Sequence, residues 1–161
     1  MDASPETYTN LATVLWMWMF PVTYLIHIAE EYWGGEGYLA YLFRLRGVEI
    51  SPTRFFVLQG VGVLLIIAGI IISQQLHFTR FMLVLLGAIV LSNGITHTIT
   101  AIRDGGYGPG LVSCVLIWIP LGLVTLIRLV GQPNTIQYVV AMMTGFAING
   151  AVAIIALRGG R

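Results

Sequence analysis

Five stretches of the chain are almost wholly apolar over the length of a membrane-spanning helix. Short segments rich in glycine, proline or charge separate these stretches, which lie at about residues 11–33, 55–74, 80–102, 110–130 and 135–157. About 20 mainly apolar residues cover the hydrocarbon core of a bilayer as a helix, and lipid offers no water to satisfy an open backbone. The pattern therefore predicts an all-α integral membrane protein, a bundle of five transmembrane helices that forms a single domain over residues 1–161.

Two local features modify this bundle. Over about residues 37–46, between the first two spans, bulky apolar residues alternate with arginines. This composition is typical of a short helix lying in the membrane interface. Pro21 and Pro120 fall inside the first and fourth spans, where the missing N–H and the ring predict kinks.

Composition agrees with the pattern. The 161 residues are 57% hydrophobic and 9% charged, whereas about 25% of the residues of soluble domains are charged. A net charge of +1 gives no reason to expect nucleic acid as a partner.

The one cysteine, Cys114, excludes an intramolecular disulfide, and we expect it to fill space in a helix. The first ten residues hold acids and no base, so we expect no cleaved signal peptide and a first helix that stays in the mature protein.

The arginines predict an orientation. Two of them, Arg80 and Arg128, fall on one side of the bundle, and six fall on the other: Arg44, Arg46, Arg54, Arg103, Arg158 and Arg161. Basic residues favour the cytoplasmic side of a membrane. We therefore expect the N-terminus outside and the C-terminus in the cytoplasm.

Polar residues lie at similar depths in three of the spans. His27, Glu30 and Glu31 follow an i, i+3, i+4 spacing near the end of the first span, which places them on one helix face. At a rise of about 1.5 Å per residue, His97 in the third span and Asn149 in the fifth lie at nearly the same height. Ionisable residues inside a membrane are costly and usually mark a site. We expect that site near the cytoplasmic surface.

Two histidines and a glutamate are a ligand set for one divalent metal, most suitably zinc, with iron as the alternative. We expect His27, Glu31 and His97 to be the ligands, because H-x-x-E-E shares the spacing of the H-x-x-E-H motif of zinc peptidases. Glu30 would then be the general base. His77 is excluded, since about 30 Å of helix separates it from His97.

Further polar residues would complete such a site. Asn93 precedes His97 by one helical turn, and Tyr107 lies in the glycine-rich segment "RDGGYGPG" that follows. Either side chain would polarise a substrate carbonyl or stabilise an oxyanion. Thr100, Asp104 and Asn149 would support the ligands from behind.

The segments "HIAEE", "NGITH" and "YGPG" resemble those of the HXXEE-motif family of small bacterial membrane proteins, over about residues 12–150. The resemblance implies a shared site that includes His27, Glu30, Glu31 and His97 in a bacterial inner membrane, but it names no reaction. The paired glutamates and the N-x-x-x-H spacing are also similar to CAAX-processing intramembrane proteases, although Gly35 stands where those enzymes have an arginine.

Three functions are open. The ligand set and its apolar surroundings favour a metal-dependent hydrolase acting on a lipid-like or membrane-borne substrate near the cytoplasmic leaflet. The second is an iron-dependent membrane oxidase, hydroxylase or desaturase. The third is an ion or small-solute carrier, or an accessory subunit of a membrane complex. The lipid bilayer is a partner in each case, and a homo-oligomer or larger complex is compatible with all three.

Overall fold

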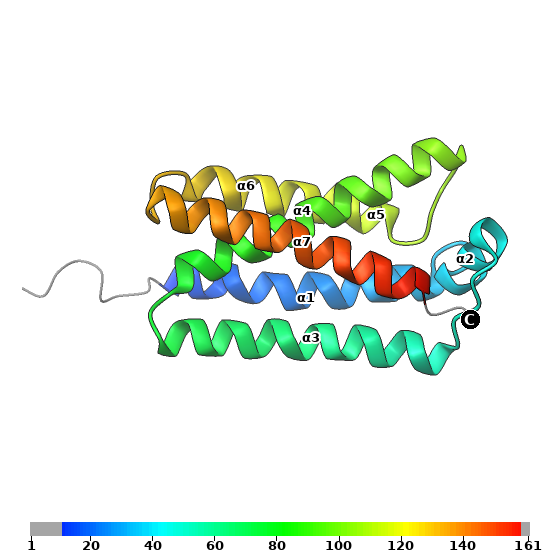
Figure 1. Ribbon diagram of the computed structural model, residues 1–161, viewed down its shortest axis with the longest axis horizontal. Coiled ribbons are helices and arrows are strands. Elements are labelled where there is room, and N and C mark those ends of the chain that lie inside the picture. The colour runs from blue at the N-terminus through cyan, green and yellow to red at the C-terminus, as the bar shows by residue number, and fades with distance from the viewer. Residues whose placement is uncertain (1–10, 159–161) are drawn as a thin grey trace, which may run out of the picture.

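A computed structural model describes residues 11–158, and every regular element in this range is helical (Figure 1). Four long helices are continuous: α1 (Leu11–Trp33), α3 (Pro52–Gln75), α4 (Thr79–Asp104) and α7 (Thr135–Arg158). The remaining long segment has three parts: α5 (Leu111–Ser113), the π-helix η2 (Cys114–Trp118) and α6 (Ile119–Leu129). The all-helical architecture is confirmed. Five segments have the length and apolar composition of membrane spans, and this composition is the basis for placing them in a bilayer.

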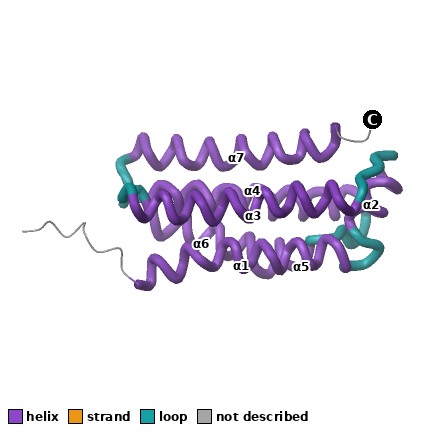
Figure 2. Tube along the Cα trace, turned by 90° about the horizontal axis from the view of Figure 1, so that it is seen from below, coloured by secondary structure: helices purple, strands orange, loops and turns teal. Residues whose placement is uncertain are grey.

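Helix α4 lies at the centre of the bundle (Figures 1 and 2). It packs against α3, α6 and α7, whereas α1 packs against α3 and α5. Buried residues make up 50% of the most apolar part of α4 but only 11% of the corresponding parts of α3 and α7. The outer faces of α3 and α7 are therefore apolar and unpaired within the described chain, as expected of surfaces that meet lipid.

The short helix α2 (Tyr38–Arg46) covers one end of the bundle. Leu42 of α2 packs with Ile50 and with Phe55 of α3 in a small apolar cluster. The following helix begins at Pro52, because Ser51 caps it by accepting a hydrogen bond from the Arg54 backbone N–H at 3.2 Å. The short helix expected at 37–46 thus exists, and it folds back over the ends of α1 and α3. Its place in the membrane interface stays a prediction.

The two prolines behave differently. Pro21 lies inside α1, which remains helical throughout. Pro120 has no N–H for the Leu116 carbonyl, and here the chain adopts a wider π turn in which the Ile119 N–H donates to the Cys114 carbonyl. The kink expected at Pro120 therefore takes the form of a π-helical segment just before the proline.

The helices alternate in direction, so the described arginines are divided between the two ends of the bundle. Arg44, Arg46, Arg54 and Arg103 lie toward the α2 end, and Arg80 and Arg128 lie toward the opposite end. The acidic N-terminal residues and Arg161, which contributed to the signal-peptide and orientation predictions, fall outside the described residues. Which end faces the cytoplasm remains a prediction.

Close packing of α7 on α4 gives a test of the fold. A Cβ at Gly145 would lie 2.7 Å from the Leu85 carbonyl oxygen and 2.7 Å from the Ala88 Cβ, whereas nothing lies within 4 Å of one at Gly150. We expect Gly145→Ala to lower the free energy of unfolding by about 1–3 kcal/mol through overpacking, and Gly150→Ala to raise it by up to about 1 kcal/mol, because alanine favours the helix and meets open space there. Thermal unfolding of both variants in detergent measures this. Equal stabilities would contradict the α4–α7 packing.

Candidate functional site

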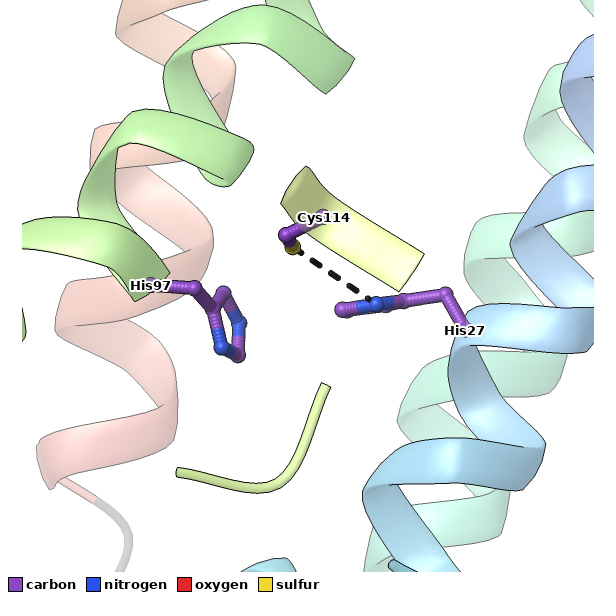
Figure 3. Close-up of side chains that lie close together, drawn as sticks. All are labelled: His27, His97 and Cys114. Carbon is purple, nitrogen blue, oxygen red and sulfur yellow. Dashed lines mark hydrogen bonds between the residues drawn. The ribbon is translucent and has the colours of Figure 1, made fainter. Parts of the chain in front are cut away.

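Two imidazoles and a carboxylate meet between α1 and α4 at the α2 end of the bundle. His27 and Glu31 come from α1 and His97 from α4, and the two histidine rings point toward one another (Figure 3). Glu31 Oε1 lies 3.5 Å from His27 Nε2 and 3.6 Å from His97 Nε2. His27 and Glu31 are 2% and 5% exposed. We call these three residues the His–Glu cluster.

The two distances from Glu31 Oε1 to the imidazole nitrogens are too long for hydrogen bonds. They exceed the roughly 2.7–3.2 Å of a hydrogen bond. Nitrogen and oxygen ligands at about 2.0–2.2 Å from a tetrahedral metal lie about 3.3–3.6 Å from one another. The distance from Glu31 Oε1 to each imidazole Nε2 is therefore the distance expected between two ligands of the same metal ion.

Each imidazole also has a hydrogen-bond partner other than Glu31 within the protein. The Ser113 hydroxyl donates to the Gly110 carbonyl at 3.1 Å, so its oxygen accepts the 2.9 Å hydrogen bond from His27 Nδ1–H. In the tautomer in which Nδ1 donates to Ser113, the Nε2 lone pair of His27 faces Glu31. The His97 ring has the Pro109 backbone carbonyl as a hydrogen-bond partner.

The other oxygen of Glu31 is held from α3. Gln59 Nε2 donates to Glu31 Oε2 at 2.7 Å, and Tyr24 donates in turn to Gln59 Oε1 at 2.6 Å. The carboxylate thus has one oxygen fixed by an amide and the other free toward the two histidines. Sequence reasoning missed both Gln59 and Tyr24, because nothing in a regular apolar helix indicates which polar side chain faces which neighbour.

The glycine loop, residues 105–110, covers the His–Glu cluster. Gly110 has a φ of +87°, and a Cβ there would lie 2.6 Å from His27 Cε1 and 3.0 Å from His97 Cε1. Backbone conformation and space both require glycine at this position. The "YGPG" segment therefore folds back over the site, as its composition suggested.

Glu30 faces the glycine loop and α5. Its Oε1 accepts hydrogen bonds from the Tyr107 hydroxyl at 2.9 Å and the Val112 N–H at 2.8 Å, and its Oε2 accepts from the Ser113 N–H at 2.6 Å. These two N–H groups belong to the first turn of α5, where no carbonyl of the helix is available to them. Within the described chain, no Glu30 oxygen lies within 4.0 Å of an imidazole nitrogen.

These contacts also determine the state of Tyr107. Burial, together with the hydrogen bond to Glu30, raises the pKa of Tyr107 to about 12. Its hydroxyl is therefore protonated near neutral pH and donates to Glu30. In this structure Glu30 and Tyr107 fasten the glycine loop to α1, and the catalytic roles expected of them stay predictions.

Cys114 is a member of the site that sequence reasoning treated as a space-filling residue. Its Sγ lies 3.8 Å from His27 Nδ1, and ligand atoms of His27, His97 and Cys114 all fall within 4.8 Å of one another (Figure 3). The residue is completely buried. One feature of the sequence could have placed Cys114 at the site. It follows Gly110 by four residues, and a loop that folds over the site also brings the next helical turn close to it.

The comparisons agree with the motif. A family model described as a protein of unknown function with an HXXEE motif matches residues 18–125. The chain belongs to this family. No curated protein and no solved structure matches the chain, and nothing in these comparisons supports the weaker similarity to CAAX-type proteases. In this HXXEE protein the first and last residues of the motif, His27 and Glu31, enter the His–Glu cluster, and the middle glutamate fastens the loop.

A groove of about 630 Å³ opens beside the cluster and receives side chains from α1, α2, α3, α4 and α7. The three cluster residues line it, and so do Asn93, Thr100 and Asn149, which the sequence placed at this site. Ser113 and Cys114 are not among its lining residues and lie on the closed side of His27.

Asp104 is held away from the groove. It accepts a hydrogen bond from the Tyr41 hydroxyl at 2.9 Å and lies 4.0 Å from Arg46. Its contacts connect the end of α4 to α2, and the expected role behind the ligands has no counterpart among them.

The role of Glu30 can be tested by hydrogen exchange. We expect Glu30→Ala to speed amide exchange in residues 105–113 by about tenfold or more, since hydrogen bonds to a charged group contribute roughly 1.5–3 kcal/mol each. Glu36→Ala is the matched control, because Glu36 pairs with Arg44 on the surface of the same end. Unchanged exchange in the Glu30 variant would show that the carboxylate does not hold the loop.

Proposed function

We propose that this HXXEE protein is a metal-dependent hydrolase acting on a lipid-like or membrane-borne substrate. The observation that carries the proposal is the ligand spacing of Glu31 Oε1 from two imidazole nitrogens. A second observation supports it: His27 Nδ1 contacts Ser113, Gln59 donates to Glu31 Oε2, and the His97 ring has a backbone partner at Pro109. Metal-ligating histidines and carboxylates almost always have such outer partners.

Two residues compete to be the third ligand. Cys114 lies near His27 Nδ1, but that nitrogen is already hydrogen-bonded to Ser113. Glu31 faces the free Nε2 atoms of both histidines and also lines the groove. A catalytic metal needs an open position that substrate can reach. We therefore favour His27, Glu31 and His97 as the ligand set, with Cys114 packed beneath it.

A divalent metal held by these residues would act as a Lewis acid toward a substrate carbonyl and toward water. Glu31 is the one carboxylate among the groove-lining residues, so as a ligand it would hold the metal where the groove opens. The amide groups of Asn93 and Asn149 line the same groove and would donate hydrogen bonds to a developing oxyanion. Glu30 and Tyr107, in contrast, keep the glycine loop in place over the reacting groups.

One observation favours a second candidate. Two histidines and one carboxylate with open positions also constitute the ligand set of non-haem iron oxygenases. An iron-dependent oxidase, hydroxylase or desaturase working on an acyl chain would use the same three residues. Metal identity separates the two candidates, because the oxidase requires redox-active iron.

Elemental analysis of protein purified without a polyhistidine tag is the direct test. We expect about one equivalent of zinc in the wild type, loss of that metal in His97→Ala, and retention in His77→Ala. His77 is a matched control because it lies just before the start of α4, at the opposite end of the bundle from the His–Glu cluster. Iron in place of zinc would favour the oxidase. Absence of metal from wild-type protein, including after incubation with zinc, would refute both enzymes and favour a carrier or accessory role.

The identity of the third ligand has its own test. We expect Glu31→Gln to lower zinc affinity by at least about tenfold, as loss of a ligand does, and Cys114→Ala to retain metal near the wild-type level. Competition with a chromogenic chelator measures both affinities. The opposite result would assign the thiolate as ligand and leave Glu31 as a base.

A further inference from the structure

The groove continues from the His–Glu cluster along the apolar part of the bundle. Helix α3 contributes Leu58, Val61 and Leu65 at helical spacing, and α7 contributes Ile148 and Val152. Leu65 is 67% exposed and Val152 is 58% exposed, so these walls also belong to the outer surface of the bundle. A polar site at one end of an open apolar groove is the form expected for an amphiphilic ligand.

The two walls of the groove, α3 and α7, differ in the helices they pack against. Helix α3 packs on α1 and α4, whereas α7 packs mainly on α4. In Figure 2, α7 lies along one edge of the bundle. A chain lying in the bilayer could therefore enter sideways between α3 and α7 without leaving an apolar environment.

The polar end of the groove carries a positive charge. Arg46 of α2 is the one cationic side chain among the lining residues. Its acidic neighbour Asp104 lies 4.0 Å away and is already hydrogen-bonded to Tyr41. Arg44, two residues earlier, is paired with Glu36 instead. The Arg46 side chain is 41% exposed, so its guanidinium can contact a negatively charged group at the mouth of the groove while it keeps its pair with Asp104.

We propose that the groove binds one acyl chain of an anionic single-chain lipid, with the chain between α3 and α7 and the charged group at Arg46. This rests on the proposed function in one respect, namely that the reacting carbonyl lies at the His–Glu cluster. A volume of about 630 Å³ falls within the roughly 300–1,000 Å³ of pockets that hold one small ligand. A second acyl chain would have to remain in the surrounding lipid.

Photolabelling tests where the chain lies. The probe is palmitic acid carrying a diazirine near its methyl end, added to the purified full-length protein and located by peptide mapping. We expect labels on the groove faces of α3 and α7. Leu65→Trp should reduce labelling about tenfold by filling the groove, whereas Leu64→Trp should not. Leu64 is a matched control, because it is 66% exposed on the same helix and does not line the groove.

The charge preference has a parallel test. We expect Arg46→Gln to weaken labelling by the palmitate probe several-fold while leaving labelling by the corresponding neutral fatty alcohol unchanged. Arg44→Gln should alter neither. Equal labelling in the Leu65 and Leu64 variants, or labels spread over the outer faces, would overturn the groove as a chain site. If Arg46→Gln and Arg44→Gln changed labelling by the palmitate probe equally, the proposal that Arg46 binds the charged group of the lipid would be wrong.

Metal content measured on the same samples keeps this inference separate from the proposed function. Zinc retained in Leu65→Trp while labelling falls would support a chain site distinct from the ligands. Labelling of the groove in protein that binds no metal would preserve the lipid site and refute the hydrolase. Zinc binding without labelling of the groove would leave the hydrolase with a different substrate.

Discussion

The structure depends on a buried carboxylate placed between two imidazoles. An ionised carboxylate inside an apolar bundle is costly, and such a group persists only when it is paired, hydrogen-bonded or bound to a cation. Glu31 is 5% exposed and has a neutral amide donor on one oxygen and two imidazole nitrogens near the other. A bound cation would supply the charge that this arrangement lacks. The histidine partners, the Gln59–Tyr24 pair and the glycine loop all serve to keep these three side chains in place.

The two adjacent glutamates show how one helical turn separates two tasks. Glu31, at i+4 from His27, projects toward α4 and joins the cluster. Glu30, at i+3, is rotated by about 100° and meets the first turn of α5. There its charge compensates the free N–H groups and the positive end of the helix. One carboxylate thus faces the two histidines, and the other orients the segment that carries Ser113 and Cys114.

The sequence predicted the helices, their directions and the depth of the polar residues, because apolar length and i, i+4 spacing are local properties. It also identified His27, Glu31 and His97, which are polar residues in long apolar runs. It could not show that the glycine loop folds back onto α1 and that Glu30 and Tyr107 hold it there, and the catalytic roles expected of these two residues stay predictions. Ser113, Cys114 and Gln59 escaped notice for the same reason. Their roles follow from contacts between segments distant along the chain, and each is an ordinary residue in its own helix.

In the proposed hydrolase, the location of the cluster would reconcile two opposing needs of hydrolysis in a membrane. The substrate chain requires an apolar path, which the groove between α3 and α7 offers, and the reaction requires water. The cluster lies at the end of α1, directly beneath the glycine loop, where Tyr107 is 43% exposed and Gly110 is buried against the histidines. Lipid would reach Glu31 from the groove side, whereas the glycine loop closes the opposite side. A loop that lifted from α1 would open the cluster to bulk water, so in the proposed hydrolase the hydrogen bonds of Glu30 to this loop and α5 would limit the entry of water.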